Sequence, residues 1–216
     1  MGIAKFPARH RTRAHPASEC VHQFLMVLSR VDPLVWRRIQ VPQSYSFWDL
    51  HVAIQDAMGW QDQHLHEFRL FDDQTRRLIS IGIPSDMSSP DRPVLPGWTI
   101  PLSRYVEARE WHGVPMLYAY DFGDDWEHLV TYEGTETARR SLKYPRCLSG
   151  ARRCPPEDCG GPHGYAELLK AIASPKHRQH TAMIEWVGGH FDPDAFDAQR
   201  VVFDDPKKRW TAAFTR

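Results

Sequence analysis

The sequence predicts an α+β fold, an antiparallel sheet of hairpins with helices packed on it and concentrated in the C-terminal third. Strand-like runs dominate the first two thirds of the chain, and helical patterns dominate the last third. Strands and helices do not alternate as they would in a doubly wound sheet. The 216 residues are enough for one sizeable core. We therefore expect a single domain over residues 19–205, a flexible basic arm over residues 1–18 and a tail over residues 206–216.

In the first half of the chain, short apolar runs separated by turn signals predict three strands and one helix. Ser46 is a good helix N-cap, and Gly59 is a good C-terminal stop. In the third strand, alternation places His64 and His66 on the same face. The expected elements are a hairpin of strands at 21–31 and 34–41, a helix at 46–58 and a strand at 64–71.

The rest of the chain begins with a loop rich in proline and glycine and ends with helices. A tight turn around Gly123 separates two strand-like runs, which predicts a second hairpin. Asp192 followed by Pro193 has the pattern of a short helix start. The expected elements are a loop at 82–97, a short helix at 102–108, strands at 114–122 and 126–133, an irregular stretch at 134–163, and helices at 165–173 and 177–187.

The composition excludes several classes of protein. Hydrophobic residues make up 42% and charged residues 25% of the chain, an ordinary globular balance. Lys plus Arg and Asp plus Glu are equal at 27 each, so attraction to nucleic acid or to anionic membranes would need a local patch. No apolar run approaches the roughly 20 residues that span a bilayer, and the N-terminus has no apolar signal-peptide region. We expect a cytoplasmic protein.

The hairpin turn is the first candidate site. Asp121 and Asp124 cluster at the turn, with His128 just beyond it, and His64 or His66 could complete the set. Carboxylates at a tight turn can converge on a hard cation, and imidazole adds a borderline ligand. The alternative is plain turn chemistry, because Asp side chains bond their own backbone in turns. The two histidines could likewise be a hydrogen-bonded pair at the edge of the core.

The cysteine loop is the second candidate site, and we treat it as separate from the hairpin. Three thiolates and one imidazole would make a closed tetrahedral zinc site, and the loop offers Cys147, Cys154, Cys159 and His163. The spacing is not that of paired C-x-x-C motifs. The alternative is a rigid loop in which the cysteines are small buried apolar residues.

The basic arm is a third, weaker candidate. Arg9, Arg11 and Arg13 could neutralise a few phosphates of a nucleic acid. A solvated tail explains the same residues. The chain has no phosphate-binding loop, dinucleotide fingerprint, nucleophile elbow or H-E-x-x-H motif.

Several sequence blocks, in order, resemble the plasmid pRiA4b ORF-3-like family. The blocks are Val35–Ile39 with Val41–Pro42, Phe47–Trp60, His64–Phe68, Tyr120–His128, Tyr144–Cys147, Cys154–Pro162, Trp186, Phe191–Pro193 and Phe196–Asp197. They cover about residues 20–200, and those between 118 and 165 are the most specific. The resemblance implies a compact α+β domain of a kind found on plasmids and near transposable elements. It assigns no role to individual residues.

Two hypotheses follow for the function. The first is an accessory binding module for protein or nucleic acid, in which the region from Tyr118 to Tyr165 forms a rigid surface stapled by zinc. The second is a metal-dependent hydrolase acting on a phosphorylated or nucleic-acid substrate. The second requires the strand with His64 and His66 to lie beside the hairpin, with their side chains converging in a cleft.

Overall fold

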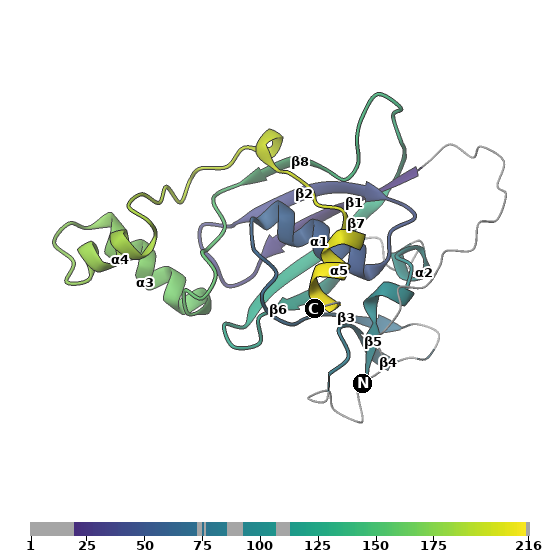
Figure 1. Ribbon diagram of the computed structural model, residues 1–216, viewed down its shortest axis with the longest axis horizontal. Coiled ribbons are helices and arrows are strands. Elements are labelled where there is room, and N and C mark those ends of the chain that lie inside the picture. Colours follow the sequence, from purple (N-terminus) through teal and green to yellow (C-terminus); the bar gives the residue numbers. More distant parts are fainter. Residues whose placement is uncertain (1–19, 73–74, 76, 86–92, 107–112, 215–216) are drawn as a thin grey trace.

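The computed structural model describes residues 20–72, 75, 77–85, 93–106 and 113–214 (Figure 1). Eight strands form one sheet in the order β5-β4-β3-β6-β7-β1-β2-β8. Every neighbouring pair is antiparallel except β4 and β5. The predicted α+β class is confirmed. The strands are β1 (Cys20–Leu28), β2 (Trp36–Pro42), β3 (His66–Asp72), β4 (Arg77–Gly82), β5 (Val94–Pro96), β6 (Pro115–Tyr120), β7 (Trp126–Thr137) and β8 (Arg146–Ala151).

Helices α3, α4 and α5 all lie in the C-terminal third of the chain, where the sequence predicts the helices to concentrate. Helix α1 follows the first hairpin and lies across the sheet, whereas α3 and α4 extend away from it (Figure 1). The helices are α1 (Phe47–Met58), α2 (Ser103–Val106), α3 (Gly161–Ala173), α4 (His180–Trp186) and α5 (Pro206–Phe214), with 3-10 turns η1 (Gly97–Thr99) and η3 (Ala198–Arg200). No helix in the described ranges is both long and apolar enough to cross a membrane.

Helix α1 is buried on nearly every side, which explains its apolar composition. Ser46 and Asp49 form a capping box, and Gly59 ends the helix in the left-handed conformation, as expected. Residues such as Leu50 pack towards the sheet in the main core. The opposite side is covered by α5, because Trp48 packs edge-on against Trp210 with ring centroids 5.3 Å apart.

Pairing of β3 with β6 brings the candidate histidines next to the hairpin. His66 lies opposite Tyr120 in this pair, and Tyr118 lies opposite His128 in the β6–β7 hairpin. His64, however, precedes β3, which begins at His66. The two histidines therefore do not share a strand face as predicted, and they enter different surroundings.

The stretch 134–163 is less irregular than predicted. Strand β7 continues to Thr137, and β8 pairs with β2 at the edge of the sheet. The β8 sequence contains glycine and lacks a clear alternation of apolar and polar residues, so its pairing depends on β2. The prediction of a short helix at Asp192-Pro193 is wrong. This segment forms a turn, and the next helical turn along the chain is η3. Residues 206–214, expected as a tail, form α5.

Candidate functional site

The hairpin turn and the cysteine loop form one surface. The carboxylate oxygen Oδ2 of Asp124 accepts a hydrogen bond from the backbone nitrogen of Gly160 at 3.1 Å. Gly161 lies so close to this turn that a Cβ atom there would be 2.2 Å from the carbonyl oxygen of Asp124. The hydroxyl of Tyr120 donates to Oε1 of Glu157 at 2.6 Å. The two segments that we treated separately in the sequence are thus docked against each other.

A third segment, the connection from α1 to β3, completes the surface. The indole nitrogen of Trp60 donates to the carbonyl oxygen of Pro155 at 2.9 Å. The Trp60 ring stacks on Tyr120 with centroids 5.0 Å apart. The backbone nitrogen of Gln61 donates to the same oxygen of Glu157 that Tyr120 contacts, at 3.0 Å. Each of these contacts joins segments distant in sequence, so together they link the α1–β3 connection to the hairpin and to the cysteine loop.

A cleft of about 600 Å³ opens on this surface, between the end of α1, the cysteine loop and the end of α4. It combines aromatic and proline rings with amides and carboxylates. Trp186 is 48% exposed, so its indole is available to a partner. The lining residues with polar or aromatic side chains are Trp60, Gln61, Gln63, Arg153, Glu157, Asp158, Trp186 and Phe191. The cleft thus offers apolar ring surface and acidic groups side by side to a ligand.

At the rim of the cleft, His64 joins two carboxylates. Its Nε2 atom lies 3.5 Å from Oδ2 of Asp121 and 3.2 Å from Oδ1 of Asp158. These are ion-pair distances, yet the alignment is not that of a hydrogen bond, because Nε2 is buried without a hydrogen-bond partner. The other oxygen of Asp121 accepts bonds from the backbone of Gly123 and Asp124. The predicted convergence of His64 with Asp121 therefore exists, and Asp158 is its third member.

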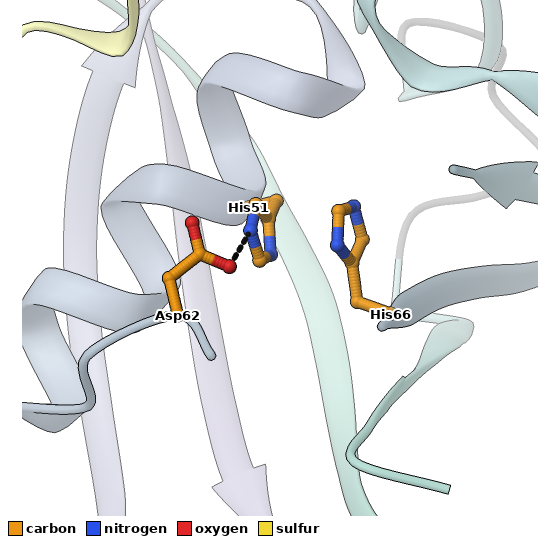
Figure 2. A group of neighbouring side chains, drawn as sticks. All are labelled: His51, Asp62 and His66. Carbon is orange, nitrogen blue, oxygen red and sulfur yellow. Dashed lines mark hydrogen bonds and ion pairs between the residues drawn. The ribbon is translucent and has the colours of Figure 1, made fainter. Parts of the chain in front are cut away.

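His66 belongs to a second, buried group with His51 and Asp62 (Figure 2). The imidazole rings of His51 and His66 stack with centroids 3.4 Å apart and planes 7° apart. Nε2 of His51 lies 2.8 Å from Oδ1 of Asp62. Burial, and then the neighbouring His51, hold the pKa of His66 well below its ordinary value. His66 is therefore a neutral ring at neutral pH.

The remaining predicted ligands lie elsewhere. The Asp124 carboxylate is engaged by Gly160, and His128 is fully buried in the core beside Trp60, with ring centroids 5.3 Å apart. Within the part of the chain that the structure describes, two sets of three side chains approach closely enough to share an ion. They are the groups of His64 and His66 just described. Arg9, Arg11 and Arg13 lie outside the described residues.

The cysteines do not gather around a common point. The Cys147 thiol donates to backbone carbonyls of Arg38 and Ser149, at 3.7 and 3.6 Å, and His163 is exposed on α3. Burial raises the pKa of the Cys154 thiol, and it raises that of Cys159 to about 12. Neither group of close ligand atoms in the described residues includes a cysteine. Zinc binding by Cys147, Cys154, Cys159 and His163 stays a prediction, and it would require the loop to draw these atoms together.

Burial of His128 predicts loss of stability in acid. Burial lowers the pKa of His128 to about 3, from an ordinary value near 6.5. Between these values the unfolded chain binds a proton that the folded chain rejects, so stability rises with pH and levels off above pH about 6.5. We expect the free energy of unfolding to fall by roughly 2–3 kcal/mol between pH 7 and pH 4.5 from this residue.

Urea unfolding at the two pH values measures this loss in the wild type and in His128→Phe, which keeps an aromatic ring. Because Phe does not titrate, the variant should lose less stability on acidification. Equal losses in the two proteins would show that His128 does not carry the effect. His66 acts with the same sign, since its pKa is also depressed by burial.

Comparison with known proteins places this architecture in a family. The model of the plasmid pRiA4b ORF-3-like protein family matches residues 21–200. The chain belongs to this family. It is 36% identical over 188 residues to the uncharacterized protein y4hQ of Sinorhizobium fredii, a match that covers 86% of this chain and 91% of that protein. The crystal structure of MM3350 from Methanosarcina mazei Go1, a protein of unknown function, matches with a TM-score of 0.77 and 37% identity, covering 87% of this chain and 100% of that one.

The match spans every segment that lines the cleft, from Met58 to Phe191. Sequence analysis named His64, His66 and Asp121 but missed His51, Asp62 and Asp158. The sequence held a signal for Asp62 and Asp158, because each lies close to glycine in a polar segment that favours a turn. The three aspartates of the two ligand groups have a left-handed backbone conformation, with φ of 59° at Asp62, 54° at Asp121 and 57° at Asp158. This conformation is uncommon for residues other than glycine.

Proposed function

We propose that this protein is a binding module and that a segment of a partner polypeptide docks in the cleft. The observation that carries the proposal is the pairing of an exposed indole, Trp186, with the exposed carboxylate of Asp158 in one cleft. Aromatic rings supply contact area at low entropic cost, and carboxylates receive basic groups. The partner segment is therefore expected to carry an apolar or aromatic residue and a Lys or Arg.

The charges favour a polypeptide over a nucleic acid. Arg153 is the one basic residue among the described residues that line the cleft, and its guanidinium lies 4.7 Å from the centre of the Phe191 ring. Nucleic-acid sites normally present several cations to the phosphates. Here two carboxylates would repel them. The hydrogen bonds of Glu157 to Tyr120 and Gln61 hold one wall rigidly, which reduces the entropy lost on binding.

Peptide selection tests this proposal. Peptides chosen from a displayed library on the whole protein should be enriched in basic and aromatic residues. Their affinity, measured by fluorescence anisotropy, should fall about 10- to 100-fold in Trp186→Ala, the size expected for loss of a central aromatic anchor.

Val202→Ala is the matched control, because Val202 is 79% exposed and does not line the cleft. The proposal fails if no peptide is enriched, or if selected peptides bind Trp186→Ala as tightly as the wild type. Enrichment of acidic peptides, or tighter binding of a labelled single-stranded oligonucleotide, would also contradict it.

A metal-dependent hydrolase is the second candidate, and the convergence of His64, Asp121 and Asp158 at the rim favours it. An ion held there would sit beside the cleft and could acidify a water molecule. The same purified protein, supplied with Mn²⁺ or Zn²⁺ and a chromogenic phosphodiester, separates the two candidates. Turnover that disappears in Asp121→Asn would favour the hydrolase, whereas peptide binding without turnover favours the binding module.

A further inference from the structure

We propose that His51, Asp62 and His66 form a binding site for one divalent transition-metal ion, with Zn²⁺ as the best match. The site is separate from the cleft and from the rim group of His64. It draws one ligand from the middle of α1, one from the α1–β3 connection and one from the first residue of β3 (Figure 2). A bound ion would therefore lock the helix to the sheet.

The ligand atoms are already close together. One atom from each of the three residues lies within 4.8 Å of the others. Ligands of tetrahedral zinc lie about 3.4 Å apart, given metal–ligand distances of about 2.0–2.1 Å. His51 and Asp62 are closer than this, at 2.8 Å. Because the two ring planes are nearly parallel, ion binding requires the imidazoles to rotate out of the stack, and His51 and Asp62 to move apart, so that the lone pairs meet at a common ion.

An unpaired buried nitrogen points to a missing ligand. His66 is 2% exposed, and its Nδ1 atom has no hydrogen-bond partner among the described residues. A buried polar atom without a partner costs about 1–3 kcal/mol. Such atoms call for an explanation, and a bound ion is one of the few that apply. Because the ring is neutral, its lone pair is free to bind a metal.

The groups around His51 suit a metal ligand. Nδ1 of His51 lies 2.8 Å from the hydroxyl of Tyr118, and the Gln55 amide lies 2.9 Å from the same hydroxyl. A metal on Nε2 places the ring proton on Nδ1, from which it donates to Tyr118. The amide of Gln55 has both a donor and an acceptor, so it can serve the hydroxyl in either arrangement. Metal-bound histidines are commonly held through their second nitrogen in this way.

The second oxygen of Asp62 also has an outer partner. Nη1 of Arg209, on α5, lies 3.6 Å from Oδ2 of Asp62. This contact holds the carboxylate while Oδ1 faces His51. Trp48 covers the pair of histidines, with ring centroids 5.2 Å from His51 and 6.0 Å from His66. The site is therefore enclosed by aromatic rings, which limits access of water.

The ligand types select the metal. Two imidazoles and one carboxylate suit zinc and its neighbours, whereas calcium and magnesium prefer oxygen ligands alone. Without sulfur, the site differs from the predicted cysteine set in its spectrum. Co²⁺ bound here should show visible d–d bands without the strong thiolate charge-transfer band that cysteine ligands give. This difference allows the two sets to be told apart in the intact protein.

The test is metal binding by the full chain after stripping with a chelator. We expect Co²⁺, and then competing Zn²⁺, to bind at about one equivalent per chain with no thiolate band. Asp62→Asn and His66→Gln keep similar size and should weaken binding about 10-fold or more, because each removes a ligand. Zn²⁺ should also raise the melting temperature of the wild type and not that of the two variants.

Two matched controls belong to the other candidate sites. His64→Gln changes the rim group, at a position two residues before His66. Cys154→Ser changes the cysteine loop. Both should bind Co²⁺ like the wild type. The proposal is overturned if the stripped wild type takes up neither metal, if Asp62→Asn and His66→Gln bind as tightly as the wild type, or if Cys154→Ser alone loses the ion. These outcomes do not depend on whether peptides bind the cleft.

Discussion

Replacing Arg37 with Met is expected to lower the free energy of unfolding by about 3–5 kcal/mol. Arg37 lies on β2 and is 1% exposed. Its Nε donates to the carbonyl oxygen of Ala57 in the last turn of α1, at 2.9 Å. Its Nη1 donates to the carbonyl oxygens of Trp36 and Ala151, at 2.8 and 2.9 Å. One side chain thus joins the helix to two strands, and Met would remove the donor to the buried carbonyl of Ala57 and to the partly buried carbonyls of Trp36 and Ala151.

The guanidinium also packs on a ring, since its carbon lies 3.7 Å from the centre of the Phe196 ring. The adjacent residue provides the control. Arg38 makes a bidentate ion pair with Glu133, with distances of 2.7 and 2.8 Å, but this pair is partly exposed. Exposed pairs contribute at most about 1 kcal/mol. Urea unfolding should therefore separate Arg37→Met from Arg38→Met by at least about 2 kcal/mol, and equal effects would contradict the role of Arg37.

Gly161→Ala is expected to lower the free energy of unfolding by about 3 kcal/mol and to disturb the cleft. Two causes act together. The residue has a φ of 67°, which disfavours a side chain, and an added Cβ would lie 2.2 Å from the carbonyl oxygen of Asp124. That oxygen is backbone and cannot move alone, so the cysteine loop would have to separate from the hairpin turn.

Gly188→Ala separates the backbone cause from the steric cause. Gly188 has a φ of 82°, yet nothing lies within 4 Å of its added Cβ. This variant carries only the penalty of a side chain in the left-handed conformation, about 1 kcal/mol. Thermal and urea unfolding of both variants should show Gly161→Ala to be the less stable by about 2 kcal/mol. If the two are equally stable, the loop and the hairpin are not in the close contact described above.

The parts of the fold that follow local rules were predictable. Helix α1 begins at a capping box and ends at Gly59, and both hairpins flank recognisable turns. Strand β8 was not predictable, because its short sequence becomes a strand only through pairing with the edge of β2. Helix α5 was missed for a similar reason. Its place depends on Trp210 packing against Trp48, a contact between residues far apart in the sequence.

The candidate sites show the same division. Residue type and turn position were enough to name His64 and Asp121, which do meet. Asp158 was missed because it reaches His64 only after the cysteine loop docks on the hairpin turn. His51 was read as part of a helix, and nothing in its neighbours along the chain indicates that its ring stacks on His66. A one-dimensional pattern cannot show such contacts, since they arise from the packing of α1 on β3.

The affinity of a selected basic peptide for the wild type and for Asp158→Lys is the most direct test of the cleft as a polypeptide site. The Asp158 side chain is 67% exposed at the rim, so the substitution reverses a charge without disturbing the core. Fluorescence anisotropy at low and high salt should show binding weakened about 10-fold or more at low salt, with a smaller difference at high salt. Equal affinity of both proteins at low salt would contradict docking in this cleft.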